Sequence, residues 1–184
     1  MQVVWSKALR AVAVATLVAA SFVPSAARAD SKLALRLGAY GSADYETRLL
    51  TDNKGVLVGL QYALSGIPNV LNGESWSTNV SVDYLFQASD NVRFQAIPVS
   101  INQVYAFEEQ SGKVPYAGFC LSAVTYKSDL VSPNQPWVTR IGGGLILGLN
   151  MNDKLFVEGR YEMYNKVKAA GVPTGFRALV GYRF

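Results

Sequence analysis

The closing stretch of the chain, Gly171-Val-Pro-Thr-Gly-Phe-Arg-Ala-Leu-Val-Gly-Tyr-Arg-Phe184, decides between two kinds of β-protein. Because successive side chains of an extended strand point to opposite faces, its two-residue alternation predicts a strand with one apolar and one charged face. A soluble β-protein would turn the apolar face to its core, whereas a transmembrane barrel would turn it to lipid. The charged face carries Arg177 and Arg183, and the apolar face carries Phe176, Ala178, Val180, Tyr182 and Phe184.

Seven earlier segments show the same two-residue alternation, so the chain is predicted to be all-β with eight strands. One segment departs from the pattern, because Gln103 interrupts its apolar series and Pro98 cannot donate a ladder hydrogen bond. We therefore expect a bulge or locally irregular pairing there, and the alternation leaves the register of that strand open. The seven segments cover about residues 32–40, 54–64, 76–86, 92–107, 114–126, 137–149 and 154–164.

Residues 1–29 have the pattern of a secretory signal peptide. Lys7 and Arg10 precede a short apolar run, and Ala27-Arg28-Ala29 predicts cleavage before Asp30, which leaves residues 30–184 as one barrel domain. This leader holds three of the 17 basic residues and none of the 13 acidic ones, so the mature chain would carry a net charge of +1. The basic character of the precursor therefore gives no support for nucleic-acid binding.

The distribution of aromatic residues favours a barrel in a membrane. Beyond the leader no apolar run approaches the roughly 20 residues of a spanning helix, so a membrane protein of this sequence would cross with strands. With both termini on one side, short connectors at 108–113 and 150–153 alternate with longer ones, as in bacterial barrels. Aromatic side chains gather at one end of the strands, which is typical of an interfacial girdle: Tyr62, Trp76, Tyr105, Phe107, Tyr182 and Phe184.

The opposite face of the strands carries charges of both signs. The chain contains no histidine. The absence of histidine removes the usual Ser-His and Cys-His nucleophile pairs and most zinc sites, so we expect no enzyme, no metal and no cofactor. Cys120 is expected to be an inert interior thiol. Glu158 and Glu162 could form a carboxylate pair, but a salt-bridge network inside the barrel is the preferred interpretation. Its predicted members are Arg36, Asp83, Arg140, Glu158, Arg160, Glu162, Arg177 and Arg183.

The segments RFQAIPVSINQVYAF and VPYAGFCLSAVTY, with the closing FRALVGYRF, resemble the small bacterial outer-membrane β-barrel proteins of the OmpA, OmpX and OmpW type. This resemblance covers the whole mature chain and implies an integral outer-membrane location after signal-peptide removal. It also implies that Val180, Tyr182 and Phe184 form the signal that the outer-membrane assembly machinery reads. The expected partners are thus outer-membrane lipid and that machinery, with no nucleic acid and a monomeric barrel.

Three functions remain open from the sequence. The first is a non-enzymatic outer-membrane barrel with a polar interior filled by side chains and a structural or surface-interaction role, because eight strands enclose little free space. The second is a narrow OmpW-like conduit for small or apolar solutes, suggested by Leu49, Leu50, Leu130 and Val131 in the predicted outer loops. The third is a secreted soluble barrel that binds a ligand inside.

Overall fold

The computed structural model describes residues 32–45, 48, 55–64, 75–88, 93–128, 136–165 and 172–184. The predicted leader and the loop residues Leu49, Leu50, Leu130 and Val131 lie outside the described residues. No helix in the described part of the chain is long and apolar enough to cross a membrane.

The described residues form eight strands that lie close to the predicted segments. Each strand alternates between buried and more exposed positions over most of its length, as a two-residue repeat requires. The strands are β1 (Leu33–Ser42), β2 (Gly55–Leu64), β3 (Trp76–Ala88), β4 (Arg93–Ala106), β5 (Val114–Ser128), β6 (Val138–Asn150), β7 (Leu155–Tyr164) and β8 (Gly175–Arg183).

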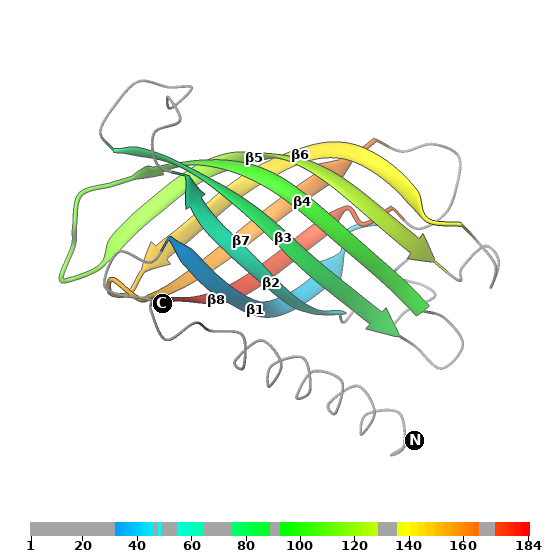
Figure 1. Ribbon diagram of the computed structural model, residues 1–184, viewed down its shortest axis with the longest axis horizontal. Helices are drawn as coiled ribbons and strands as arrows, with labels where there is room; N and C mark the ends of the chain where they lie inside the picture. The colour runs from blue at the N-terminus through cyan, green and yellow to red at the C-terminus, as the bar shows by residue number, and fades with distance from the viewer. Residues whose placement is uncertain are drawn as a thin grey trace, which may run out of the picture. The chain divides into compact units, whose positions relative to one another are not determined.

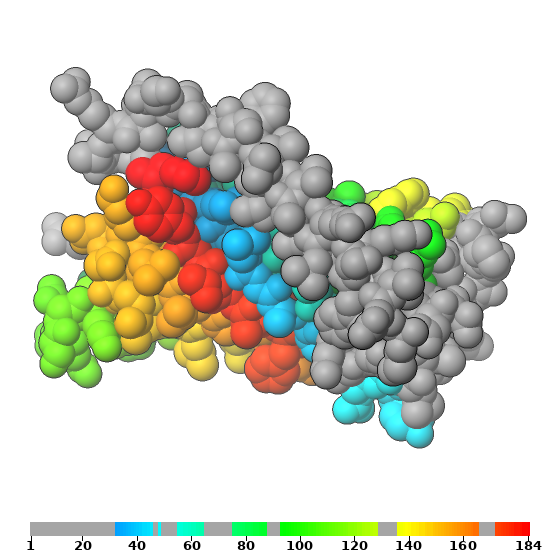
Figure 2. All heavy atoms as spheres, turned by 90° about the horizontal axis from the view of Figure 1, so that it is seen from below, coloured from blue at the N-terminus to red at the C-terminus, as the bar shows by residue number. Residues whose placement is uncertain are grey.

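The strands pair in chain order and close into an antiparallel barrel (Figure 1). Closure depends on the first and last strands, which pair from Ala34 opposite Arg183 to Ser42 opposite Gly175. Figure 2 shows β8, in red, directly beside β1, in blue, on one face of the molecule. A closed sheet leaves no strand edge with unpaired backbone groups. The predicted eight-stranded antiparallel barrel is therefore confirmed.

The two ends of the barrel differ in their connections. At the end that holds the start of β1 and the end of β8, hereafter the turn end, short turns join β4 to β5 and β6 to β7. The first of these turns is a two-residue hairpin in which Gln110 and Lys113 exchange backbone hydrogen bonds of 2.8 and 3.1 Å. Its central residues, Ser111 and Gly112, have φ values of 53° and 76°, the positive values that a type I′ turn requires. The opposite end is hereafter the loop end.

The exterior of the barrel is apolar, and its interior contains most of the polar side chains. Leu121, Ile141 and Leu145 are 69%, 68% and 67% exposed, whereas Arg36 and Asn102 are fully buried. The alternation therefore points the apolar positions outward and the charged positions inward, the reverse of a soluble barrel.

Pro98 does not produce a bulge. The β3–β4 ladder runs from Trp76 opposite Tyr105 to Val82 opposite Val99, and it resumes in the same register at Leu85 opposite Ala96. On its other side β4 pairs with β5 without interruption, and Pro98 lies opposite Val124. Of the two expected outcomes, the structure has the locally irregular pairing and not the bulge: two rungs are missing on one side of the strand, at and beside the residue that lacks a donor, but no residue is inserted.

Inward-facing aromatic rings pack onto glycines of neighbouring strands. A Cβ atom added to Gly181 would collide with the ring of Phe156, which lies opposite it, and one added to Gly148 would collide with Tyr116. The narrow interior accepts a large ring only where the adjacent strand has no side chain. The same arrangement recurs where Tyr164 lies opposite Gly142. These glycines therefore allow close packing of the rings.

Candidate functional site

Six charged side chains in the middle of the barrel form a closed ring of ion pairs. Three are arginines and three are carboxylates, so their formal charges cancel. Each arginine contacts two carboxylates, and each carboxylate contacts two arginines. In ring order the members are Asp83, Arg36, Glu158, Arg160, Glu162 and Arg177, which we call the charge ring.

The distances around the charge ring divide into short hydrogen-bonded pairs and longer contacts. The Arg36 Nη2 to Asp83 Oδ2 distance is 2.6 Å, and the Arg177 Nη2 to Glu162 Oε2 distance is 2.9 Å. Arg160 donates from Nε to Glu158. The longer contacts, from 3.5 to 4.0 Å, link these three pairs into the ring. Since every member is at least nine-tenths buried, each charge depends on its neighbours rather than on water for stabilisation.

Neutral side chains also form hydrogen bonds with the charge ring. Arg160 Nη1 donates to Asn102 Oδ1 on β4 at 3.0 Å, which ties β7 to another part of the barrel wall. Tyr116 Oη donates to Glu158 at 3.0 Å, and Tyr164 Oη donates to Glu162. Asn102 in turn donates to Asn79. Such partners satisfy lone pairs that burial would otherwise leave without hydrogen bonds.

Two apolar layers lie on either side of the charge ring inside the barrel. Toward the loop end the layer contains Tyr40, Leu57, Leu85, Phe94, Ala96, Val124, Tyr126, Tyr164, Val172 and Leu179. Toward the turn end the layer contains Ala34, Tyr116, Cys120, Ile146 and Phe156. The interior is thus charged in the middle and has an apolar layer on either side, whereas the sequence predicted a polar interior without these layers.

Two of the eight residues predicted for the interior network lie outside the charge ring. Arg140, near the loop end of β6, donates to the backbone carbonyl of Thr139 at 2.9 Å. Arg183, at the turn end of β8, donates to Asn150 Oδ1 at 2.7 Å and stacks 4.7 Å from the Phe156 ring centroid. Both occupy inward positions of their strands, but they lie too close to the barrel ends to reach the carboxylates in the middle.

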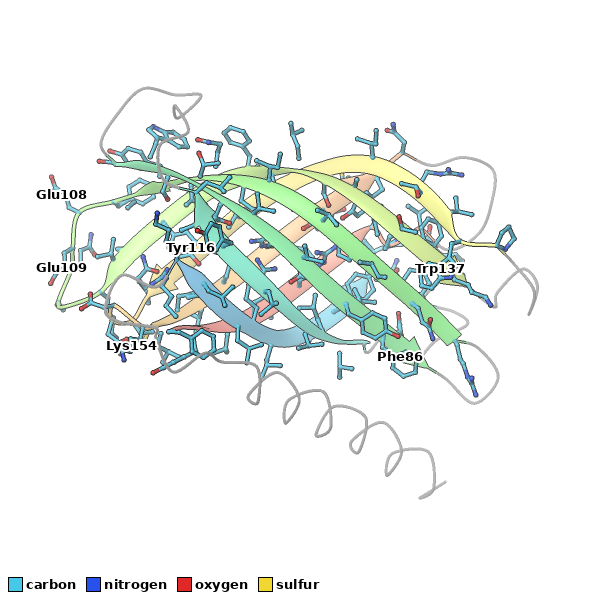
Figure 3. The ribbon with its side chains drawn as sticks, viewed as in Figure 1. Phe86, Glu108, Glu109, Tyr116, Trp137 and Lys154 are labelled. Atoms are coloured by element: carbon cyan, nitrogen blue, oxygen red, sulfur yellow. The ribbon has the colours of Figure 1, made fainter. Side chains whose placement is uncertain are left out.

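The six residues of the predicted girdle all lie at the turn end of their strands. Trp76 and Tyr105 are register partners with ring centroids 5.3 Å apart, and Tyr105 also contacts Phe107 at 5.2 Å. Tyr182 contacts Phe184 at 5.7 Å. Tyr62 is 48% exposed on the outer face of β2. At the loop end, Phe86 and Trp137 lie close to the opposite rim (Figure 3).

The sequence did not reveal a polar pair on the outer wall. Gln103, which interrupts the apolar face of β4, donates to Thr78 on β3, and both side chains are at least nine-tenths buried. Trp76 and Phe119, whose ring centroids are 6.4 Å apart, lie next to this pair. The only available signal was that Thr78 and Gln103 both fall on otherwise apolar faces. Their pairing depends on a register that alternation alone does not supply.

The interior contains one thiol and the two carboxylates that the sequence singled out as a possible pair. Cys120 is a free, buried cysteine in the turn-end apolar layer. Glu158 and Glu162 both contact Arg160 as members of the charge ring. No group of three or more histidine, cysteine, aspartate or glutamate side chains in the described part of the chain could hold a metal ion.

Removing one carboxylate from the charge ring should destabilise the barrel. Asp83→Asn leaves Arg36 and Arg177 with one carboxylate fewer, and an uncompensated buried charge costs about 3–5 kcal/mol. We expect the urea midpoint of unfolding in detergent to fall for Asp83→Asn and to recover in part in the Arg36→Gln/Asp83→Asn double variant. Glu109→Gln, in an exposed turn, is the control and should leave the midpoint unchanged. Equal midpoints for Asp83→Asn and Glu109→Gln would contradict this role.

Comparison with solved structures identifies barrels of the same fold. No protein-family model matches the chain, and no curated protein is significantly similar to it. The Neisserial surface protein A is 19% identical with a TM-score of 0.55, and the match covers 83% of this chain and 95% of that one. Ail of Yersinia pestis is 16% identical with a TM-score of 0.45, and the match covers 85% of this chain and all of Ail. OprG of Pseudomonas aeruginosa is 11% identical with a TM-score of 0.47, over 84% of this chain and 96% of OprG. The match with the Neisserial surface protein A confirms, for the fold, the predicted resemblance to small outer-membrane barrels.

Proposed function

We propose that this chain is a non-enzymatic β-barrel of the bacterial outer membrane whose lumen is closed by side chains and whose role is structural or surface interaction. The observation that carries the proposal is the combination of an apolar exterior with a charge ring between two apolar layers. An apolar exterior is suited to contact with lipid, and the interior holds the charged side chains that would be unstable in lipid.

The exposed apolar side chains argue against a secreted soluble barrel. Leu145 and Leu147 of β6 are each 67% exposed, and Ile141 and Leu121 nearby are similarly exposed. A continuous apolar surface of this kind on a water-soluble monomer would promote association. The fold shared with the Neisserial surface protein A supports the same placement. Location in the outer membrane therefore explains the exterior better than secretion does.

The packed interior argues against a conduit through the barrel. The guanidinium groups of Arg36, Arg160 and Arg177 fill the middle of the lumen, and the rings of Phe94 and Tyr126 pack toward the loop end. An eight-stranded barrel has room for side chains but not for an additional aqueous channel. We therefore favour a closed barrel over an OmpW-like conduit.

Three further features belong to the same proposal. Removal of residues 1–29 would release a mature barrel that begins near β1, and both of its termini would then lie on the periplasmic side. Val180 and Tyr182 are 51% and 44% exposed on the outer face of β8, where the assembly machinery could read them together with Phe184. We propose a monomer, because the closed sheet leaves no strand edge for pairing with a second copy.

Cell fractionation and gel mobility test the membrane assignment. We expect the chain in detergent-extracted outer membranes and, on gels, faster migration of the unheated sample than of the boiled one. The physical reason is that a closed barrel resists unfolding in cold detergent. Recovery in the periplasmic supernatant, with the same mobility before and after boiling, would overturn the assignment.

Planar-bilayer recording tests the closed lumen. The purified chain, inserted into bilayers, should give no stable conductance steps, because the charge ring and both apolar layers block the axis. A general porin recorded under the same conditions is the positive control. Reproducible steps that depend on the amount of this chain would favour a conduit instead.

Substitution of the last residue tests the assembly signal. Phe184→Ala should reduce the amount of folded, heat-modifiable chain in the outer membrane by about tenfold or more, a loss equivalent to about 1.4 kcal/mol in recognition. Phe176→Ala removes an aromatic residue that is 64% exposed on the same face of β8 and serves as the matched control. If both variants accumulate equally, Phe184 has no special role in assembly.

A further inference from the structure

A cavity of about 190 Å³ lies at the turn end of the barrel interior. Its walls bring together Glu158 from the charge ring and Arg183 from the end of β8, with amide side chains including Asn79 and Gln61 between them. Figure 3 shows Tyr116, which also lines the cavity, inside the barrel wall toward the end that carries Glu108, Glu109 and Lys154. The cavity thus contains one anionic and one cationic group that belong to different parts of the fold.

Arg183 is held in place with donors to spare. Its Nη2 donates to Asn150 Oδ1 at 2.7 Å, its Nη1 donates to the Asp153 carbonyl at 3.3 Å, and its guanidinium stacks on Phe156. A guanidinium has five N–H donors, so these two hydrogen bonds leave capacity for a planar acceptor. None of the ion pairs described for the barrel neutralises Arg183 with a carboxylate. A ligand carboxylate is the group that it fits best.

Glu158 likewise has acceptor capacity beyond its described partners. One oxygen accepts from Arg160 Nε and the other accepts from Tyr116 Oη at 3.0 Å, whereas an ionised carboxylate offers about four acceptor sites. Glu158 is the member of the charge ring that lines this cavity. It is only 6% exposed, so a donor bound beside it would be shielded from water. An ammonium group is a donor that could occupy the remaining acceptor sites of Glu158.

We propose that this cavity is a binding site for a small zwitterion that carries a carboxylate and a primary ammonium group, of the size of a small free amino acid. The carboxylate pairs with Arg183, and the ammonium donates to Glu158. A ligand of zero net charge preserves the charge balance of the interior, whereas a simple anion or cation would disturb it. Apolar side chains, among them Val104 and Ala106, line the rest of the cavity and limit the size of the ligand.

The site is blind rather than part of a passage. Tyr116 and Phe156 belong to the turn-end apolar layer, and the members of the charge ring other than Glu158 do not line the cavity. A bound zwitterion would therefore enter and leave from the turn end. Because this inference depends on the cavity and not on the surrounding lipid, binding can be measured in detergent, and its failure would leave the proposed location and closed lumen intact.

Titration of the ¹⁵N-labelled chain in detergent micelles with L-alanine, N-acetylalanine and alaninamide tests both charges of the ligand. We expect saturable shifts of the Arg183 Nε–Hε signal and of the Asn150 backbone amide with L-alanine. N-acetylalanine lacks the ammonium and alaninamide lacks the carboxylate, so each should bind about tenfold or more weakly, since a charged hydrogen bond is worth about 1.5 kcal/mol or more. Equal binding of L-alanine and either derivative, or no saturable shift with L-alanine, would overturn the proposal.

Three variants separate binding at the cavity from effects on folding. Arg183→Gln removes the cation, and Ala106→Leu fills part of the cavity without changing any charge; both should weaken L-alanine binding about tenfold or more. Arg140→Gln, which removes an arginine at the loop end, should leave binding unchanged. Backbone amide signals of β6 and β7 away from the cavity should be retained in all three variants. Loss of binding in Arg140→Gln, or its retention in Ala106→Leu, would place the binding elsewhere.

Discussion

The alternating ring of three arginines and three carboxylates is the interaction on which the interior of the barrel depends. Removing a charge from water costs several kcal/mol, and an ion pair offsets this cost only when its geometry is good. Here each buried charge has two partners of opposite sign, so no member relies on a single contact. Four strands contribute members, and the ring therefore favours one arrangement of β1, β3, β7 and β8 around the axis.

The narrow lumen also explains where the large and small side chains lie. Three inward positions of β7 in succession carry Glu158, Arg160 and Glu162, which concentrates volume and charge at the middle of the barrel. Toward both ends, aromatic rings replace charges, and glycine lies opposite several of them, as Gly181 does opposite Phe156. The interior thereby reaches close packing without a side chain at every inward position. At several positions a large inward ring and a glycine on the adjacent strand therefore occur together.

The two-residue alternation was enough to predict the fold, because a buried face fixes which residues of a strand share a side. It predicted the eight strands and which residues share one face of each strand. The alternation could not predict the position of each side chain along the barrel axis or the register between neighbouring strands. Arg140 and Arg183 occupy inward positions of their strands, as Arg160 does, yet they lie too near the strand ends to join the ring. Gln103 and Thr78 looked like separate interruptions of two apolar faces, and only the β3–β4 register makes them partners. Pro98 suggested a bulge or an irregular pairing because its missing donor is visible in the sequence. The sequence could not decide between the two, because the uninterrupted pairing of β4 with β5 is not visible in it.

A lumen closed as we propose would confine any binding to the ends of the barrel, and the two ends are not equivalent. At the turn end, Gln110 and Lys113 exchange backbone hydrogen bonds in one short turn, and Arg183 donates to Asn150 beside another. A fixed rim lowers the entropy that a small ligand must overcome to find its partners. The charge ring adds a further requirement, because it presents Glu158 to the cavity while its other members do not line the cavity. The charge ring, which we propose closes the barrel to passage, would therefore also supply one of the two charges that a ligand at the turn end would meet.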